Sequence, residues 1–392
     1  MLDAGRVPSA SGRLAGRRIC MILTNGYRPD VRVEKEAKAL AEEGATITIF
    51  AWDRTGSKAA VERVAERVTV RREAVLSSDG IGARQLPRLL RYCQRVVGQI
   101  RSTTWDAIHA HDLDGLLAGV MCNRASSKLV YDAHEVYPLL VADRLGSLAG
   151  KGAWLLERVL RRRTDLVITD GRRRAQVMRR VFGSSPVIVE NTAEVARFAN
   201  CSKWRPEKRA ELRIPADAWV IGIFTGLNRG WDAGLLPGLL EMLPDAYGVV
   251  AGAGAESKKV AELAESHPRL RYLGFVHDIV PWYGAVDNIL YLMDPMSRNA
   301  RFGFPNNVAS AVAAGVPIVV LDIGECAYLV RRYGIGPVVK NATVPETLAA
   351  LLQLRSKPYY RQCVQAMRTA RHRFDWSTSR QTLIDAYCSL LS

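Results

Sequence analysis

The chain has 392 residues, 48% of them hydrophobic, and its 55 Lys and Arg against 39 Asp and Glu residues make the formal net charge +16. This length predicts two domains, and the hydrophobic content predicts sizeable cores and excludes a disordered polymer. No apolar run approaches the roughly 20 residues of a membrane span. Residues 1–17 predict a disordered arm rather than a secretion signal. The seven scattered cysteines include no CxxC pair, which favours the reducing cytoplasm.

The first half alternates short apolar runs with helical patterns. Strands are predicted at residues 18–24, 45–52, 107–110, 128–132, 165–169 and 187–190, with a helix at 31–43. After a polar stretch at 194–217 the alternation restarts, with strands at 219–224, 247–251, 269–273, 288–292 and 318–321. Such alternation produces βαβ units and parallel sheets. We therefore predict an α/β protein of two doubly wound, Rossmann-like domains, 18–196 and 197–372, that face each other across a cleft.

Ligands of open α/β sheets bind beyond the carboxyl ends of the strands, so the loops there are the candidate sites. In the second domain, Gly226, Asn228 and Arg229 follow the first strand, where Gly would let backbone amides approach an anion that Arg229 chelates. Gly252 and Gly254 follow the next strand and allow a similar approach. Both loops are equally compatible with simple strand–turn–helix junctions.

The longest of these loops runs from residue 294 to residue 315. Its residues Gly303, Pro305 and Asn306 fit a tight turn that opens a helix of small residues at 308–314. Such a helix packs closely on a sheet and directs its N-terminal amides toward the ligand, as a pyrophosphate requires.

In the first domain, strand alternation puts His109 and His111 on one side of a strand, with His111 nearer the carboxyl end. A histidine there can donate to a sugar hydroxyl or to a leaving group. Asp112 and Asp114 resemble the DxD motif of metal-dependent sugar transferases, but the position at a helix start favours Asp112 as an N-cap. The histidines show no other metal-binding spacing, and we predict no metal.

Two further polar clusters are candidate acceptor-binding residues. Asp132, His134 and Glu135 follow a predicted strand, and Asp30 and Arg32 begin the first helix. A helix-capping role is an equal alternative for both clusters.

The positive charge concentrates in the first half, where residues 1–196 hold 32 basic and 22 acidic residues. The helical pattern at 84–101 combines an apolar stripe with five arginines, which suits either an anionic membrane or the cover of a sheet. Compositional bias explains the surplus equally well. An anionic membrane surface or an anionic acceptor is therefore a candidate partner, whereas no aromatic and basic nucleic-acid module is present.

Taken together, these segments resemble the retaining GT-B glycosyltransferases of family 4. The resemblance spans about residues 18–340 and is carried, in order, by PDVRVEKEAKALAEEGATITIFAWDR, DAIHAHDLDGLLAG, KLVYDAHEVYP, FTGLNRGWD, VVAGAG, RYLGF and FPNNVASAVAAGVPIVV. Residues 373–392 resemble the family's C-terminal helix that crosses back to the first domain.

The resemblance implies sugar transfer from a UDP- or GDP-sugar to a hydroxyl of a glycan, glycolipid or natural product, with retention and without a metal or other cofactor. It places the donor in the second domain and the acceptor in the first. His111 matches the family's cleft histidine, and Arg229 matches the first of its two diphosphate-binding basic residues. Asn306 matches the Asn of the family's Pro-Asn-Lys (PNK) loop. From the cysteines and the surplus charge we expect a cytoplasmic protein, peripheral on the inner face of the membrane if the surplus charge binds lipid.

Three positions depart from the family pattern. The family has two glutamates eight residues apart, and this chain has Phe302 and Ser310 at their positions. At the position of the basic residue of the PNK loop it has Asn307. We therefore predict donor binding by Gly303, Phe304, Asn306, Asn307 and Ser310, with Ser310 as a weak substitute at the ribose. A nucleotide-sugar epimerase of the same fold and a non-catalytic scaffold remain the alternatives.

Overall fold

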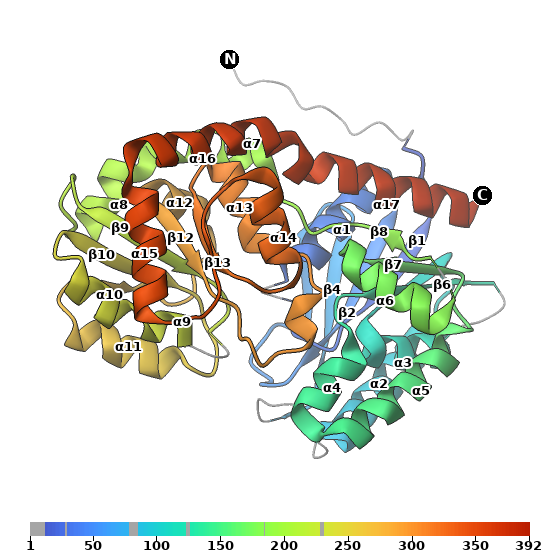
Figure 1. Cartoon of the computed structure of the whole chain (residues 1–392). Coiled ribbons are helices and arrows are strands. Elements are labelled where there is room, and N and C mark those ends of the chain that lie inside the picture. Colours follow the sequence, from blue (N-terminus) through green and yellow to red (C-terminus); the bar gives the residue numbers. More distant parts are fainter. Residues whose placement is uncertain (1–11, 28–29, 78–84, 123–125, 184, 228–230) are drawn as a thin grey trace. The chain divides into compact units, whose positions relative to one another are not determined.

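The computed structural model describes residues 12–27, 30–77, 85–122, 126–183, 185–227 and 231–392, and forms two compact units (Figure 1). Unit 1 comprises Met1–Glu190 and Ser379–Ser392, and unit 2 comprises Asn191–Thr378. The division after Glu190 lies near the boundary predicted at residue 196. Within the described ranges, no helix is both long and apolar enough to span a bilayer.

Unit 1 is built on an eight-stranded sheet in the order β3-β4-β2-β1-β5-β6-β7-β8, and all of its pairs except β3–β4 are parallel. The strands are β1 Arg18–Ile22, β2 Thr46–Asp53, β3 Val61–Ala65, β4 Val68–Ala74, β5 Ala107–His111, β6 Lys128–Ala133, β7 Leu166–Thr169 and β8 Val187–Ile188. The sequence did not predict β3 and β4. Most of β3 is solvent-exposed or half-buried, so it lacks the continuous apolar run of a central parallel strand.

Seven helices of the described chain belong wholly or in part to unit 1. They are α1 Val31–Glu42, α2 Leu86–Arg101, α3 Asp112–Cys122, α4 Tyr137–Leu145, α5 Ser147–Arg161, α6 Arg172–Phe182 and α17 Trp376–Leu391, which joins unit 1 from Ser379 onward. Helix α2 buries Cys93, Val96 and Ile100 in the core beneath it. It therefore covers the sheet, as one of the two interpretations of its stripe predicted.

Unit 2 has a six-stranded, wholly parallel sheet in the order β11-β10-β9-β12-β13-β14. Its strands are β9 Trp219–Phe224, β10 Ala246–Ala251, β11 Leu270–Tyr272, β12 Asn288–Tyr291, β13 Ile318–Leu321 and β14 Val338–Val339. Its helices are α7 Val195–Phe198, η2 Cys201–Trp204, α8 Arg205–Glu211, α9 Trp231–Gly234, α10 Leu236–Met242, α11 Ser257–Ser266, α12 Val280–Ala285, η3 Asn299–Arg301, α13 Asn306–Ala314, α14 Gly324–Tyr333, α15 Val344–Arg355, α16 Lys357–Ala370 and η4 Arg371–Phe374. Separate apolar cores lie on its two sides, one containing α13 and the other α10 and α15.

The polar stretch at 194–217, for which the sequence predicted no helix or strand, contains the helices α7, η2 and α8. Arg209 of α8 is buried, and its Nη2 donates to Asp287 Oδ2 over 2.8 Å. Its Nε donates to the carbonyl of Ala285, and Asp287 also accepts from the backbone N–H of Val220. A buried ion pair therefore attaches this polar segment to the sheet, which hydrophobic periodicity does not reveal.

Both sheets reverse their strand order beside the first strand, between β1 and β5 in unit 1 and between β9 and β12 in unit 2. In open α/β sheets this reversal leaves a crevice at the carboxyl ends of the two flanking strands, where ligands bind. The loops after these four strands therefore position the candidate site residues.

We predict that Gly252→Ala destabilises unit 2 by about 2–4 kcal/mol. Gly252 has φ 149°, and a Cβ there would lie 1.8 Å from the carbonyl oxygen of Thr225 in the neighbouring loop. Gly234→Ala is the control, because a Cβ at Gly234 meets nothing within 4 Å. Urea unfolding of both variants measures the difference, and equal stabilities would contradict the prediction.

Candidate active site

The core of the unit 1 site is a buried ion pair between α1 and β6. Arg32 donates from Nε and Nη2 to the two carboxylate oxygens of Asp132, over 3.2 and 2.7 Å, and from Nη1 to the carbonyl of Val189 over 2.6 Å. Both side chains are almost fully buried. Burial alone would raise the pKa of Asp132, but Arg32 and His134 hold it well below its usual range. Asp132 is therefore ionised.

His134 and His111 adjoin this carboxylate. His134 Nε2 lies 2.8 Å from Asp132 Oδ2 and 3.0 Å from His111 Nδ1. Burial opposes a charge on His134, but Asp132 and Asp112 raise its pKa to about 10. Burial and the neighbouring His109 hold the pKa of His111 well below its usual range. At neutral pH, His134 is therefore a cation and His111 is neutral.

These protonation states assign the tautomer of His111. A proton on His134 Nε2 lies within hydrogen-bond distance of both Asp132 Oδ2 and His111 Nδ1; with Nδ1 of His111 as the acceptor, the proton of His111 resides on Nε2. His111 Nε2 is buried and has no hydrogen-bond partner within the part of the chain that the structure describes. Its N–H is therefore a donor available to a ligand.

His109 packs against His111 and connects it to helix α17. The rings of His109 and His111 stack with centroids 4.3 Å apart, and His109 Nδ1 lies 2.7 Å from the hydroxyl of Tyr387 on α17. His109 Nε2 lies 3.9 Å from Glu36 Oε2. Burial and the nearby Asp132 raise the pKa of Glu36 to about 8, although Arg32 opposes this shift.

Glu36, His109, His111 and Asp132 also form a set of metal-ligand types, since one ligand atom from each lies within 4.8 Å of the others. Arg32 Nη2, however, lies 2.7 Å from Asp132 Oδ1 and 3.1 Å from Glu36 Oε1. The guanidinium therefore already supplies positive charge to both carboxylates. The absence of a metal stays a prediction.

The prediction that Asp112 caps its own helix is wrong. Asp112 has φ 56° and is the first residue of α3, and its Oδ1 accepts from the backbone N–H groups of His134 and Glu135 over 3.0 and 3.2 Å. Its carboxylate thus holds the loop after β6 in place. Asp114 accepts from the hydroxyl of Thr24, after β1.

Asp30 and Glu135, the other candidate acceptor-binding residues, differ in their partners and in their exposure. Asp30 caps α1 by accepting from the N–H of Val33, which confirms the capping interpretation, and it also accepts from Asn25. Glu135 is partly exposed, 3.6 Å from the buried Arg174. Three residues of this site were not predicted from the sequence: Arg174, Glu36 and Tyr387. Glu36 was detectable as the i+4 neighbour of Arg32 on α1.

In unit 2, the loops after β9 and β10 lie against each other. Leu227 N–H donates to the carbonyl of Ala253, and Glu256 N–H donates to that of Leu227. The structure therefore brings Gly226 together with Gly252 and Gly254, and Gly226 and Gly254 are exposed. Asn228 and Arg229 lie outside the described residues.

The loop after β12 leads to η3 and α13. Asn306 and Asn307 are the first residues of α13, no side chain caps its amino end, and Asn306 is exposed. Phe304 is buried and packs beside Phe374, whereas Phe302 and Gly303 are half-buried. Ser310 is half-buried and lies near the buried Tyr283, whose pKa it lowers against the larger, raising effect of burial.

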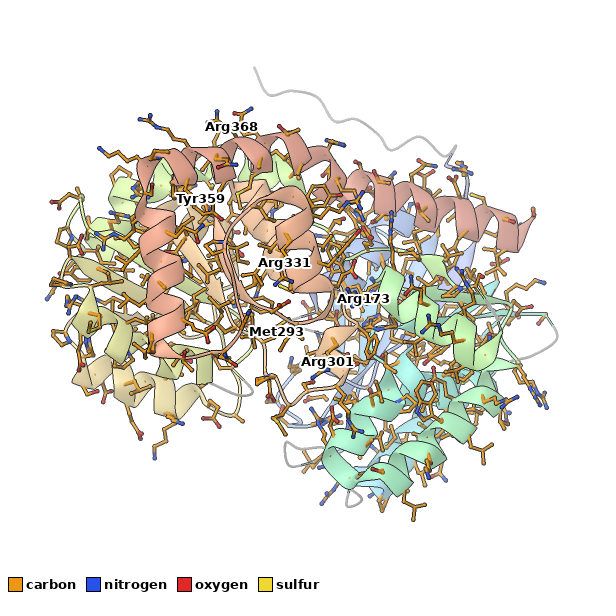
Figure 2. All side chains as sticks on the ribbon, viewed as in Figure 1. Arg173, Met293, Arg301, Arg331, Tyr359 and Arg368 are labelled. Atoms are coloured by element: carbon orange, nitrogen blue, oxygen red, sulfur yellow. The ribbon has the colours of Figure 1, made fainter. Side chains whose placement is uncertain are left out.

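Arg301 is a further basic residue of this loop and was not predicted from the sequence. It ends η3 directly before Phe302 and is exposed (Figure 2). Its Nη2 lies 3.5 Å from the carbonyl of Pro295, a weak contact. The nearby Arg331 is instead paired with Asp322 over 2.5 Å.

We predict that Glu36→Gln changes how stability depends on pH. The pKa of Glu36 rises from 4.5 to about 8 on folding, so stability conferred by the protonated carboxyl is lost as pH rises through this window. Gln cannot ionise, so the melting temperature of the variant minus that of the wild type should increase from about pH 5 to about pH 9. Glu34→Gln, on the more exposed side of α1, is the control. A pH-independent offset would contradict the prediction.

Comparisons with known proteins agree with this architecture. Residues 29–192 match the family model described as glycosyl transferase 4-like domain, and residues 235–357 match that of glycosyl transferases group 1. The chain is 25% identical over 393 residues to D-inositol 3-phosphate glycosyltransferase of Rhodococcus jostii, covering 91% of this chain and 83% of that protein.

Two solved structures share the fold. Sucrose-phosphate synthase of Thermosynechococcus elongatus has a TM-score of 0.78 at 15% identity, over 95% of this chain and 99% of that one. Anabaena HepE in complex with UDP-glucose has a TM-score of 0.73 at 18% identity, over the same shares. With two glycosyltransferase models matching its two α/β units, the chain belongs to the GT-B glycosyltransferases.

Proposed function

We propose that the protein transfers a sugar from a UDP- or GDP-sugar to a hydroxyl of a glycan, glycolipid or natural-product acceptor, with retention at the anomeric carbon. The observation that carries the proposal is the neutral His111, whose buried Nε2 lacks a partner within the described chain. It ends β5, beside the strand-order reversal of unit 1. The UDP-glucose bound to HepE supports a nucleotide-sugar donor.

In this proposal unit 2 binds the nucleotide sugar. The exposed Gly226 and Gly254 and the close approach at Gly252 offer backbone amides to the diphosphate, together with the amino end of α13. Arg229 and Arg301 supply the cations that neutralise it, and Asn228, Asn306 and Asn307 donate hydrogen bonds. Gly303, Phe304 and Ser310 shape the loop around the nucleoside.

In this proposal His111 Nε2–H donates to a hydroxyl of the donor sugar and orients it. The acceptor hydroxyl attacks the anomeric carbon from the face that the diphosphate leaves, so one C–O bond forms as the other breaks. The departing diphosphate oxygen takes the acceptor's proton, and retention then requires no enzymic nucleophile. Cationic residues stabilise the leaving group by preorganised charge.

The acceptor is proposed to bind to unit 1. Asp30 and Glu135 are its direct contacts, because neither is fully buried. Arg32, Asp132 and His134 are occupied with one another, so their contribution is to hold the loop after β6 and the ring of His111. The curated relative, by its name, acts on an inositol phosphate.

We predict that His111→Ala lowers the rate of sugar transfer or of nucleotide-sugar hydrolysis about 100-fold, because one preorganised donor is lost. A mass-spectrometric screen of UDP- and GDP-sugars measures hydrolysis without knowledge of the acceptor. Affinity for UDP should change little. His372→Ala, an exposed histidine of η4 in unit 2, is the control. An unchanged rate in the His111 variant would refute its role.

We predict that removal of divalent metal with EDTA leaves both the hydrolysis rate and the melting temperature unchanged. Arg32 already contacts the carboxyl groups of Glu36 and Asp132 in the only metal-ligand cluster found in the described ranges. A loss of activity or stability that zinc restores, and that Glu36→Gln abolishes, would instead assign a metal to this cluster.

A further inference from the structure

Helix α5 of unit 1 carries a stripe of apolar side chains turned toward solvent. Leu148 is 85% exposed, Leu155 65% and Val159 53%. Their spacing of seven and four residues puts all three on one face of the helix, at about 100° per residue. An exposed stripe of this length is uncommon on a monomeric soluble protein and marks an interaction surface.

The orientation of the stripe is fixed by contacts on the opposite face of α5. There Gly150 packs so closely on α4 that a Cβ would lie 2.5 Å from the Cβ of Ala142. Glu157 is buried and accepts a hydrogen bond of 2.9 Å from the hydroxyl of Tyr131 on β6, and Leu160 is buried as well. Figure 1 shows α5 beside α4 in unit 1. The three apolar side chains therefore cannot turn inward without breaking this packing.

Basic side chains border the stripe. Lys151, Arg158 and Arg162 are exposed, and none of them forms an ion pair with another described residue. By helical geometry all three lie within about 90° of the stripe, on the same flank. The only acidic residue of α5, Glu157, points into the unit. The exposed face of α5 is thus apolar and purely cationic.

We propose that this face of α5 docks on an anionic lipid bilayer, with Leu148, Leu155 and Val159 entering the acyl boundary and the flanking cations at the lipid phosphates. Leucines bordered by Lys and Arg are the pattern of helices that lie in the membrane interface. The proposal goes beyond sugar transfer and uses none of its site residues.

The location differs from the one that the sequence suggested. In α2 the apolar residues Cys93, Val96 and Ile100 cover the sheet, and only Leu86 and Leu90 near its start are substantially exposed. The stripe of α5 is longer, and each of its three side chains is more than half exposed. It therefore accounts better for a membrane-facing surface on the basic half of the chain.

Vesicle flotation of the full chain tests the proposal. With about 30% phosphatidylglycerol in phosphatidylcholine, the wild type should bind at low salt and dissociate as salt rises to about 0.5 M, because exposed charges are then screened. Leu148→Ser/Leu155→Ser should weaken binding about tenfold or more at every salt concentration. Arg158→Gln/Arg162→Gln should weaken it mainly at low salt.

Leu352→Ser, at a leucine of α15 that is 53% exposed in unit 2, is the matched control and should bind as the wild type does. Without vesicles, all of these variants should hydrolyse nucleotide sugar at the wild-type rate, which separates loss of docking from failure of the proposed reaction. The proposal is overturned if the wild type does not float, or if the Leu148/Leu155 variant floats equally well. It is also overturned if sedimentation shows that the stripe joins two copies of the chain instead.

Discussion

The ion pair between Arg32 and Asp132 is the interaction on which the unit 1 site depends. A guanidinium and a carboxylate buried this deeply would each be strongly unfavourable alone, and removal of one partner from such a pair typically destabilises a protein by about 3–5 kcal/mol. The pair joins α1 to β6, and the hydrogen bond from Arg32 to the carbonyl of Val189 adds the segment after β8. Three segments distant in sequence are thereby fixed around one carboxylate.

The same pair determines the protonation of the histidines. Because Asp132 stays ionised, it stabilises a proton on His134, and the charged His134 makes a second cation at His111 unfavourable. Neutral His111 then accepts at Nδ1 and keeps its proton at Nε2. Glu36 is the variable member of the group, since its raised pKa lets it gain or lose a proton near neutral pH. A buried network arranged in this way gives His111 one orientation and one tautomer.

Much of the fold could be predicted from the sequence, because the central parallel strands are buried on both sides and appear as continuous apolar runs. Residues 219–224 and 318–321, for example, coincide with β9 and β13. The edge strand β3 was missed because none of its residues is buried, and β14 was missed because it has only two residues. The stretch at 194–217 was missed because a buried ion pair rather than an apolar face attaches its helix α8.

The site was predictable only where local periodicity determines it. Alternation along β5 placed His109 and His111 on one side, and their rings are stacked. No local pattern could connect Tyr387 with His109, since α17 returns from the far end of the chain. The positive φ of Asp112 likewise depends on the loop that its carboxylate binds, so the helix start alone suggested the wrong role.

In the proposed reaction, binding of the nucleotide-sugar donor depends on different interactions from those that hold the unit 1 site together. Neither Phe302 nor Ser310 offers a carboxylate to the ribose hydroxyls. What the described part of the loop does offer is positive charge at Arg301 and the uncapped amino end of α13. Binding that rests on a diphosphate rather than on ribose contacts should discriminate weakly between bases and fall steeply with salt. The loss of the family glutamates therefore points to a change in what selects the donor, from the nucleoside to the diphosphate and the sugar.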